Sequence, residues 1–152
     1  MNNIGEALRE TRTYYDLTQD DIAKIMNISK SSISHYEKND WIIPIKNLAL
    51  LADHLNISID YILKLTKVKN YDNSRKGIDL SLMSKRVCEI CSDLNYNNVQ
   101  FAKYLNTSES NIRNYKKGIY PILTAFAVQM ALKNRYSIDW IIGKSDIKFI
   151  NY

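Results

Sequence analysis

Apolar side chains recur three and four positions apart along almost the whole chain, and strand-like alternation is nearly absent. This spacing places them on one face of an α-helix and predicts an all-α protein. Turn-forming residues divide the pattern into ten segments. The expected helices span residues 4–14, 19–26, 30–38, 45–55, 58–65, 80–94, 97–105, 109–117, 123–133 and 138–142.

The pattern repeats once, at a constant offset and without a gap, so that residues 22–63 correspond to residues 101–142. Identical pairs include Ala23/Ala102, Asn27/Asn106, Ile33/Ile112, Tyr36/Tyr115, Ser58/Ser137 and Asp60/Asp139. A period well beyond the roughly 20 to 50 residues of solenoid repeats indicates two whole domains. We therefore expect two tandem five-helix domains, each containing a helix-turn-helix unit, at residues 1–66 and 79–146. A basic linker at residues 67–78 joins them, and an apolar tail follows at residues 147–152.

Local signals define several helix ends. Thr18, with Asp21 three residues later, has the pattern of a capping box, and Ser29 stands at the N-cap of the helix that follows. Asn39 comes after residues 30–38, where a C-terminal cap needs a positive φ. The second copy has Gly118 at the same place, and glycine adopts this conformation most easily.

The net charge of +5 is unevenly distributed. Residues 1–66 sum to −2, residues 67–78 to +3 and residues 79–152 to +4. A basic linker and second domain suit a polyanionic partner. The first domain would have to bind such a partner through local placement of charge rather than through a net field.

The sequence contains no motif for catalysis, for a cofactor or for a metal ion. Its four glycines form no phosphate-binding loop, and no nucleophile has a base at motif spacing. Cys88 and Cys91 lack the second pair or the nearby histidine of a zinc site, so we interpret them as ordinary helix residues. No stretch approaches the about 18 apolar residues of a membrane span. We expect a cytoplasmic protein without a membrane partner, associated with the nucleoid.

Residues 17–23 (LTQDDIA), 28–37 (ISKSSISHYE), 51–52 and 58–63 (SIDYIL) occur in an order that resembles the lambda-repressor/Cro-like (XRE) helix-turn-helix family. The resemblance covers nearly all of residues 4–65, and residues 80–145 resemble the family more weakly. It implies five helices in each copy and binding of double-stranded DNA through the third helix.

In that family the third helix enters the major groove, where each base pair presents a distinct set of donors and acceptors. The resemblance implies that bases are read by Lys30, Ser31, Ser34 and His35 in the first copy and by Glu109, Ser110, Arg113 and Asn114 in the second. It implies phosphate contacts for Gln19, Ser29, Lys38, Asn39, Asn98, Lys116 and Lys117. Lys30 or protonated His35 would suit guanine, whereas Asn114 would suit adenine.

The family also tends to have an Arg and Glu pair that links the first helix to the end of the third, and Arg12 with Glu37 occupies those places. Cys91 and Lys116 stand at the matching positions of the second copy. Both partners are therefore replaced together, as expected of a real pair, because one uncompensated half-buried charge is costly.

These residues predict a sequence-specific, double-stranded DNA-binding transcriptional regulator, namely a phage- or mobile-element-type repressor that occludes a promoter. An extended linker of about eleven residues would reach roughly 35 to 40 Å, and half-sites recur about every 34 Å. One chain could then occupy both half-sites of a duplex. Because the two third helices differ at the reading positions, the site should not be palindromic.

Two alternatives remain open. The chain could be a protein-interaction module, such as an antirepressor or adaptor, and the acidic first domain and Glu109 favour this. It could instead combine one DNA-reading domain with one dimerising domain. Trp41–Ile43 and the tail are apolar enough to be interfaces, so a homodimer through the fifth helix or the tail, or a protein antirepressor as partner, is open. The tail could equally fold back over its own domain.

Overall fold

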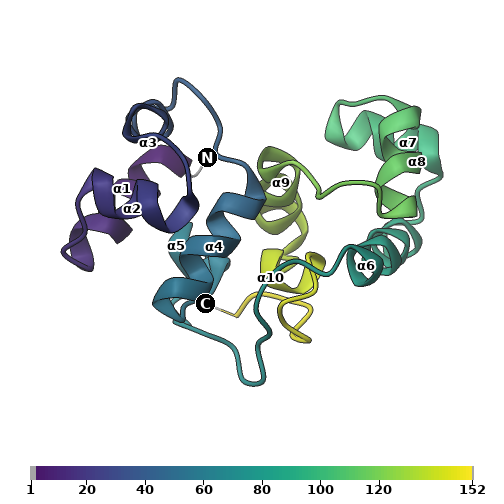
Figure 1. Cartoon of the computed structure of the whole chain (residues 1–152). Coiled ribbons are helices and arrows are strands. Elements are labelled where there is room, and N and C mark those ends of the chain that lie inside the picture. Colours follow the sequence, from purple (N-terminus) through teal and green to yellow (C-terminus); the bar gives the residue numbers. More distant parts are fainter. Residues whose placement is uncertain (1–2, 152) are drawn as a thin grey trace.

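The computed structural model describes residues 3–151, and over this range the chain forms ten α-helices and no β-strand, which confirms the predicted all-α class. The helices are α1 (Ile4–Tyr14), α2 (Gln19–Met26), α3 (Lys30–Glu37), α4 (Ile45–Leu55), α5 (Ile59–Ile62), α6 (Leu80–Asp93), α7 (Asn98–Leu105), α8 (Glu109–Lys117), α9 (Thr124–Asn134) and α10 (Ile138–Ile141) (Figure 1). Within the described range, no helix is both long and apolar enough to span a membrane. Two residues of the first predicted domain, Met1 and Asn2, and Tyr152 of the predicted tail lie outside the described residues.

The backbone repeats at the offset found in the sequence. Helices α2, α4 and α5 have the same bounds as α7, α9 and α10 once 79 is added to each residue number. Five positions with positive φ recur in the same way, pairing Asp16, Asn27, Asn39, Asn56 and Lys64 with Asn95, Asn106, Gly118, Arg135 and Gly143. The left-handed conformation predicted for Asn39 and Gly118 is confirmed, with φ of 62° and 69°.

The predicted helix caps form hydrogen bonds. Thr18 Oγ1 accepts from the backbone N–H of Asp21 at 3.0 Å, and Asp21 Oδ2 accepts from the N–H of Thr18 at 2.8 Å. Asn97 and Gln100 make the corresponding reciprocal pair at α7. These contacts satisfy N–H groups that the first turn of a helix leaves without a backbone partner.

Matching positions supply the core of each half. Ile22, Ile33 and Ile62 are fully buried in the first half, and Phe101, Ile112 and Ile141 are fully buried at the equivalent positions of the second. These side chains lie on the faces that the apolar spacing predicts. Helices α2–α3 lie at one end of the molecule and α7–α8 at the other, with α4, α5, α9 and α10 in between (Figure 1).

Two short helices, α5 and α10, meet at the centre of the molecule through a pair of buried aspartates. Asp139 accepts the backbone N–H groups of Ile59 and Asp60 at 3.0 and 2.9 Å, and Asp60 accepts the N–H of Ile138 at 2.8 Å. The Tyr71 hydroxyl also donates to Asp60, at 2.7 Å. Burial raises the pKa of both carboxyl groups, and the nearby charge of Asp60 raises that of Asp139 further.

The segment between the halves is packed rather than extended. Tyr71 is buried against Asp60, the N–H of Arg75 donates to the Lys144 carbonyl at 2.7 Å, and the N–H of Gly77 donates to Asp53 at 2.8 Å. The reach expected of an extended linker therefore does not set the distance between the halves. Packing fixes it instead, because the segment's backbone and side chains bond to both halves.

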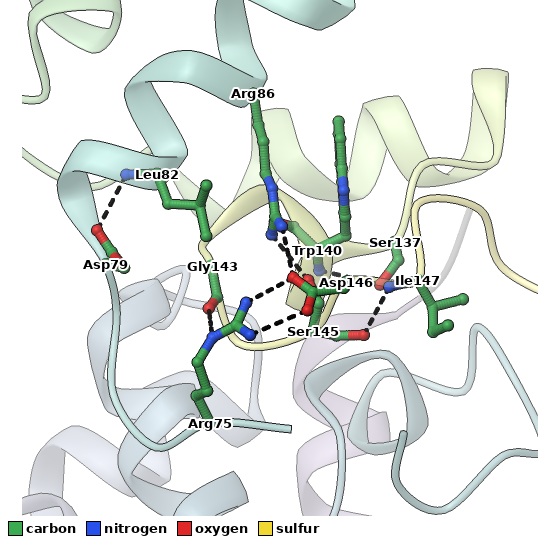
Figure 2. A network of polar contacts seen from close by, with 10 residues as sticks. All are labelled: Arg75, Asp79, Leu82, Arg86, Ser137, Trp140, Gly143, Ser145, Asp146 and Ile147. Atoms are coloured by element: carbon green, nitrogen blue, oxygen red, sulfur yellow. Dashed lines mark hydrogen bonds and ion pairs between the residues drawn. The ribbon is translucent and has the colours of Figure 1, made fainter. Parts of the chain in front are cut away.

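Two arginines meet at Asp146, and one of them, Arg75, joins the connecting segment to the second half. Figure 2 shows Arg75, from the connecting segment, and Arg86, from α6, converging on Asp146. Arg86 is buried, donates to the carbonyl oxygens of Trp140 and Ser145, and lies 4.9 Å from the centre of the Trp140 ring. The two guanidinium groups lower the pKa of Asp146 to about 2.

The tail folds back onto the chain, the second of the two arrangements that the sequence left open. Ile150 is buried and donates its N–H to the Arg135 carbonyl at 2.9 Å, and Phe149 stacks on Tyr136. Thr66 of the first half donates to the Asn151 carbonyl at 2.7 Å. Both surfaces suggested for a homodimer, the fifth helix and the tail, thus pair within one chain.

The apolar loop Trp41–Ile43 has mixed surroundings. Ile43 is buried, and its carbonyl accepts from the Thr124 hydroxyl of α9. Ile42 is 58% exposed and borders a 250 Å³ apolar cavity between the two halves. Part of this loop is therefore an internal contact between the halves rather than a surface for another molecule.

Candidate nucleic-acid interface

Helix α3 presents a short polar face to solvent. Lys30 and Ser31 are exposed, whereas Ser34 and His35 are half-buried. On the other side, Ile33 is fully buried and Tyr36 packs against the core. The N-cap Ser29 accepts from the Ser32 N–H at 3.1 Å, which fixes where the helix begins. The four residues expected to read bases thus share an accessible part of one anchored helix.

A close approach between α1 and the end of α3 sets the angle of that helix. A Cβ atom at Gly5 would lie 2.8 Å from the Glu37 carbonyl oxygen and would also contact the Tyr36 carbonyl oxygen. The N–H of Gly5 donates to Asn39 Oδ1 at 2.9 Å, and Asn39 Nδ2 donates to Asn3 at 2.6 Å. Asn39 was expected to meet phosphate, but both ends of its amide are engaged in joining α3 to α1.

Arg12 and Glu37 form the ion pair that links α1 to α3. Arg12 Nε donates to Glu37 Oε2 at 2.7 Å and Nη2 donates to Oε1 at 3.0 Å, while Nη1 reaches the Leu17 carbonyl. Glu37 is only 5% exposed, and its hydrogen bond and charge raise the pKa of Arg12. Gln19 Nε2 donates to the same carboxylate at 3.1 Å, so the pair also orients the glutamine at the start of α2.

Acidic residues lie beside two of the expected reading residues. His35 Nδ1 lies 3.0 Å from Asp40 Oδ2, and the His35 ring stacks on Trp41 with centroids 4.1 Å apart. Lys30 Nζ lies 3.8 Å from Asp20, and both side chains are well exposed. Such an exposed pair is weak, so Lys30 can exchange Asp20 for another acceptor, whereas His35 is held from two sides.

The equivalent face of α8 has Glu109 in place of Lys30 and Arg113 in place of Ser34, and it is organised differently. Glu109, Ser110, Arg113 and Lys117 are exposed. Asn114 Nδ2 donates to the Tyr120 hydroxyl at 3.2 Å, and that hydroxyl donates to Asn111. Lys38 and Lys117, the matching cations at the ends of the two helices, are both exposed and accessible to phosphate.

The second half has other residues at the positions of the Arg12–Glu37 ion pair, namely Cys91 and Lys116. Lys116 Nζ donates to Asn98 at 2.6 Å, so the two residues at the positions of Glu37 and Gln19 contact each other as those do. Cys91 stands at the position of Arg12 and is buried, which raises its pKa to about 11. The two second-half residues expected to meet phosphate, Asn98 and Lys116, are thus engaged with each other.

Sequence reasoning did not predict that four residues beside these helices, Asp20, Asp40, Trp41 and Tyr120, contact side chains of α3 or α8. One signal was present, because Trp41 and Tyr120 occupy equivalent positions of the repeat and are both aromatic. No group of three or more His, Cys, Asp or Glu residues in the described part of the chain is placed to hold a metal ion.

Comparisons with known proteins found a family and one relative that this chain resembles. Residues 8–62 match a family described as helix-turn-helix. The uncharacterized HTH-type transcriptional regulator YobD of Bacillus subtilis (strain 168) is 34% identical over 73 residues, which are 48% of this chain and 65% of that protein. The chain thus spans slightly less than two thirds of that relative's length. No solved structure matches.

Proposed function

We propose that this protein is a sequence-specific, double-stranded DNA-binding transcriptional regulator that reads its site with two helix-turn-helix domains held as a fixed pair in one chain. The observation that carries the proposal is the α2–α3 unit, whose polar face is accessible while Arg12–Glu37 and Gly5 hold it against α1. The helix-turn-helix match over residues 8–62 and the likeness to a protein named as a transcriptional regulator support it.

The division into two domains, residues 1–66 and 79–146, is part of this proposal. It is supported by helix bounds and positive-φ positions that recur in both halves at one constant offset. The contact between α5 and α10 joins equivalent positions, as a dimer interface with two-fold symmetry would. One chain would then take the place of two repressor subunits.

In this proposal, α3 and α8 each lie in the major groove, and exposed cations at their ends contact phosphates. Lys30, Ser31, Ser34 and His35 read one half-site, and Glu109, Ser110, Arg113 and Asn114 read the other. Gln19 and Lys38 in the first half, and Lys117 in the second, position the domains on the backbone. Because the two reading sets differ, the two half-sites are different sequences.

We further propose that the regulator acts in the cytoplasm, at the nucleoid, as a repressor of the phage or mobile-element type. Two domains bound to neighbouring half-sites would cover the intervening duplex and exclude polymerase from a promoter there. A reporter gene placed behind the selected site tests the sign: co-expression should lower its transcription, and a rise would identify an activator.

One observation favours a protein-interaction module instead. Asp20 and Asp40 place carboxylates beside Lys30 and His35, and the first domain has a net charge of −2. Carboxylates weaken attraction to phosphate. They would suit a basic protein surface, such as that of an antirepressor or its target.

Selection from a random duplex library with the purified full-length chain distinguishes these functions. Two unlike boxes at fixed spacing, bound by one chain per duplex, are the expected result. One box or a palindrome would assign the second domain to dimerisation, and no enrichment would favour the protein-interaction module. Within an enriched site, Lys30→Ala with His35→Ala should remove preference in one box alone, and Arg113→Ala with Asn114→Ala in the other.

A further inference from the structure

An aromatic residue follows α3 and α8 at the same place in each half. Trp41 and Tyr120 are equivalent positions of the repeat, and each contacts the polar side chain six residues before it on the preceding helix. Those side chains, His35 and Asn114, are themselves at equivalent positions. Trp41 is 51% exposed, so burial in the core does not account for its position.

In the first half the contact is a ring stack. The His35 and Trp41 rings lie 4.1 Å apart at an interplanar angle of 24°, and Asp40 Oδ2 lies 3.0 Å from His35 Nδ1. A carboxylate only accepts hydrogen bonds, so Nδ1 carries the hydrogen in this contact. Nε2 is then the nitrogen that His35 presents to a base edge, as an acceptor when the ring is neutral.

In the second half the contact is a hydrogen bond. The Tyr120 hydroxyl accepts from Asn114 Nδ2 at 3.2 Å and donates to Asn111 Oδ1. The Tyr120 ring packs edge-on against Tyr115, which is 1% exposed, so the hydroxyl is anchored to the core. A side-chain amide has two N–H groups and one carbonyl. Asn114 keeps one N–H and the carbonyl, the pair that adenine takes in the major groove.

We propose that Trp41 and Tyr120 are positioning residues for DNA recognition, each holding the reading side chain of its own half, His35 or Asn114, in the orientation that meets a base edge. This inference rests on the proposed function. Immobilising a free side chain at an interface costs about 0.5–1.5 kcal/mol, and an aromatic partner that holds it beforehand reduces that cost. Two chemically unlike pairs at one place share this role.

The test in the second half compares Tyr120→Phe, Asn114→Ala and the double variant on the site selected by the full-length wild type. Tyr120→Phe removes only the hydroxyl. We expect Tyr120→Phe to reduce the preference for the selected base about fivefold to tenfold. The effect should fall on the single base pair at which Asn114→Ala abolishes that preference. Because both variants would act through one contact, the double variant should lose no more than Asn114→Ala alone. Tyr96→Phe, in the same half, is the matched control and should change nothing.

The test in the first half uses Trp41→Leu, which removes the stacked ring, and Trp41→Phe, which retains one. Trp41→Leu should weaken the base preference at the base pair where His35→Ala abolishes it. Trp41→Phe should retain most of that preference. Circular dichroism of each variant checks its fold. If Trp41→Leu does not fold, Trp41→Phe and Tyr120→Phe carry the test.

The outcomes separate the two proposals. If the wild type enriches no sequence, both fall. If the wild type selects a site but the aromatic variants keep its base preferences, or lose affinity equally for every sequence, only the positioning role is overturned. If only one box is enriched, the aromatic variant of the half that reads this box tests the positioning role.

Discussion

Asp60 and Asp139 cap each other's helices across the centre of the molecule: Asp139 accepts the N–H groups at the start of α5, and Asp60 accepts the N–H of Ile138 at the start of α10. The two residues are equivalent in the repeat, so one position contacts its own counterpart. A carboxylate at a helix N-terminus satisfies backbone donors that have no partner within the helix. The contact therefore joins the halves, because backbone N–H groups at the start of each short helix find their acceptor in the other half.

Replacing Asp139 tests this contact. Asp139→Ala leaves the buried N–H groups of Ile59 and Asp60 without their acceptor, and each such group costs about 1–3 kcal/mol. We expect the free energy of unfolding in urea to fall by roughly 2–4 kcal/mol. Asp72→Ala, at an exposed aspartate of the connecting segment, should change it by less than about 0.5 kcal/mol. Equal effects of the two substitutions would contradict a structural role for the pair.

The same pair makes the stability of the folded chain depend on pH. Both carboxyl groups have raised pKa values in the folded chain, so the folded state binds more protons than the unfolded state above the ordinary Asp pKa of 3.8. Their contribution to stability is present below that value and is lost as the pH rises through the folded-state pKa. Urea titrations over a pH series should show the wild type losing unfolding free energy relative to Asp139→Asn as the pH rises. A constant difference would rule out this linkage.

Gly5 limits how closely α1 and α3 can approach. Gly5 lies within α1 at ordinary helical φ, so alanine would by itself favour the helix by roughly 0.5–1 kcal/mol. Its Cβ would instead collide with the carbonyl oxygens of Tyr36 and Glu37. We expect Gly5→Ala to lower the thermal midpoint through a net loss of about 1–3 kcal/mol.

Gly77→Ala is the comparison for Gly5. Gly77 has a φ of +78° with no atom within 4 Å of an added Cβ, so its substitution reports backbone strain without a collision. It should cost about 1–2 kcal/mol. It should also leave DNA binding by the first domain intact, whereas Gly5→Ala should weaken it by changing the angle of α3. A stabilising Gly5→Ala would show that the helices can move apart freely.

The Arg12–Glu37 pair should matter more than an exposed pair. Arg12→Ala leaves Glu37, 5% exposed, without its cation, and we expect a loss of about 2–4 kcal/mol. Adding Glu37→Gln should recover much of it, because the uncompensated charge is then gone. Lys64→Ala removes the exposed pair with Glu10 and should cost less than about 0.5 kcal/mol. Urea unfolding of these variants checks this, and no recovery in the double variant would refute the charge argument.

Much of the fold could be predicted from sequence because the helices depend on interactions between residues close together in the chain. The helix bounds follow from apolar spacing, from the Thr18–Asp21 capping box and from residues that tolerate positive φ, such as Asn39 and Gly118. The partners Arg12 and Glu37 were identifiable from the family resemblance. Asn39 shows the limit, since a residue chosen for its place near phosphate has an amide already engaged with α1.

The sequence by itself determined the helices, the constant offset between the halves, and the polar faces of α3 and α8, because each depends on residues near one another in the chain or on direct comparison of its two copies. The tertiary structure alone decided that residues 67–78 pack instead of extending, that the tail folds back, and that Asp60 meets Asp139. It also decided which aromatic residue contacts His35 and Asn114. Those contacts depend on how helices that are themselves predictable pack in three dimensions, and apolar periodicity specifies a buried face without specifying which surface covers it.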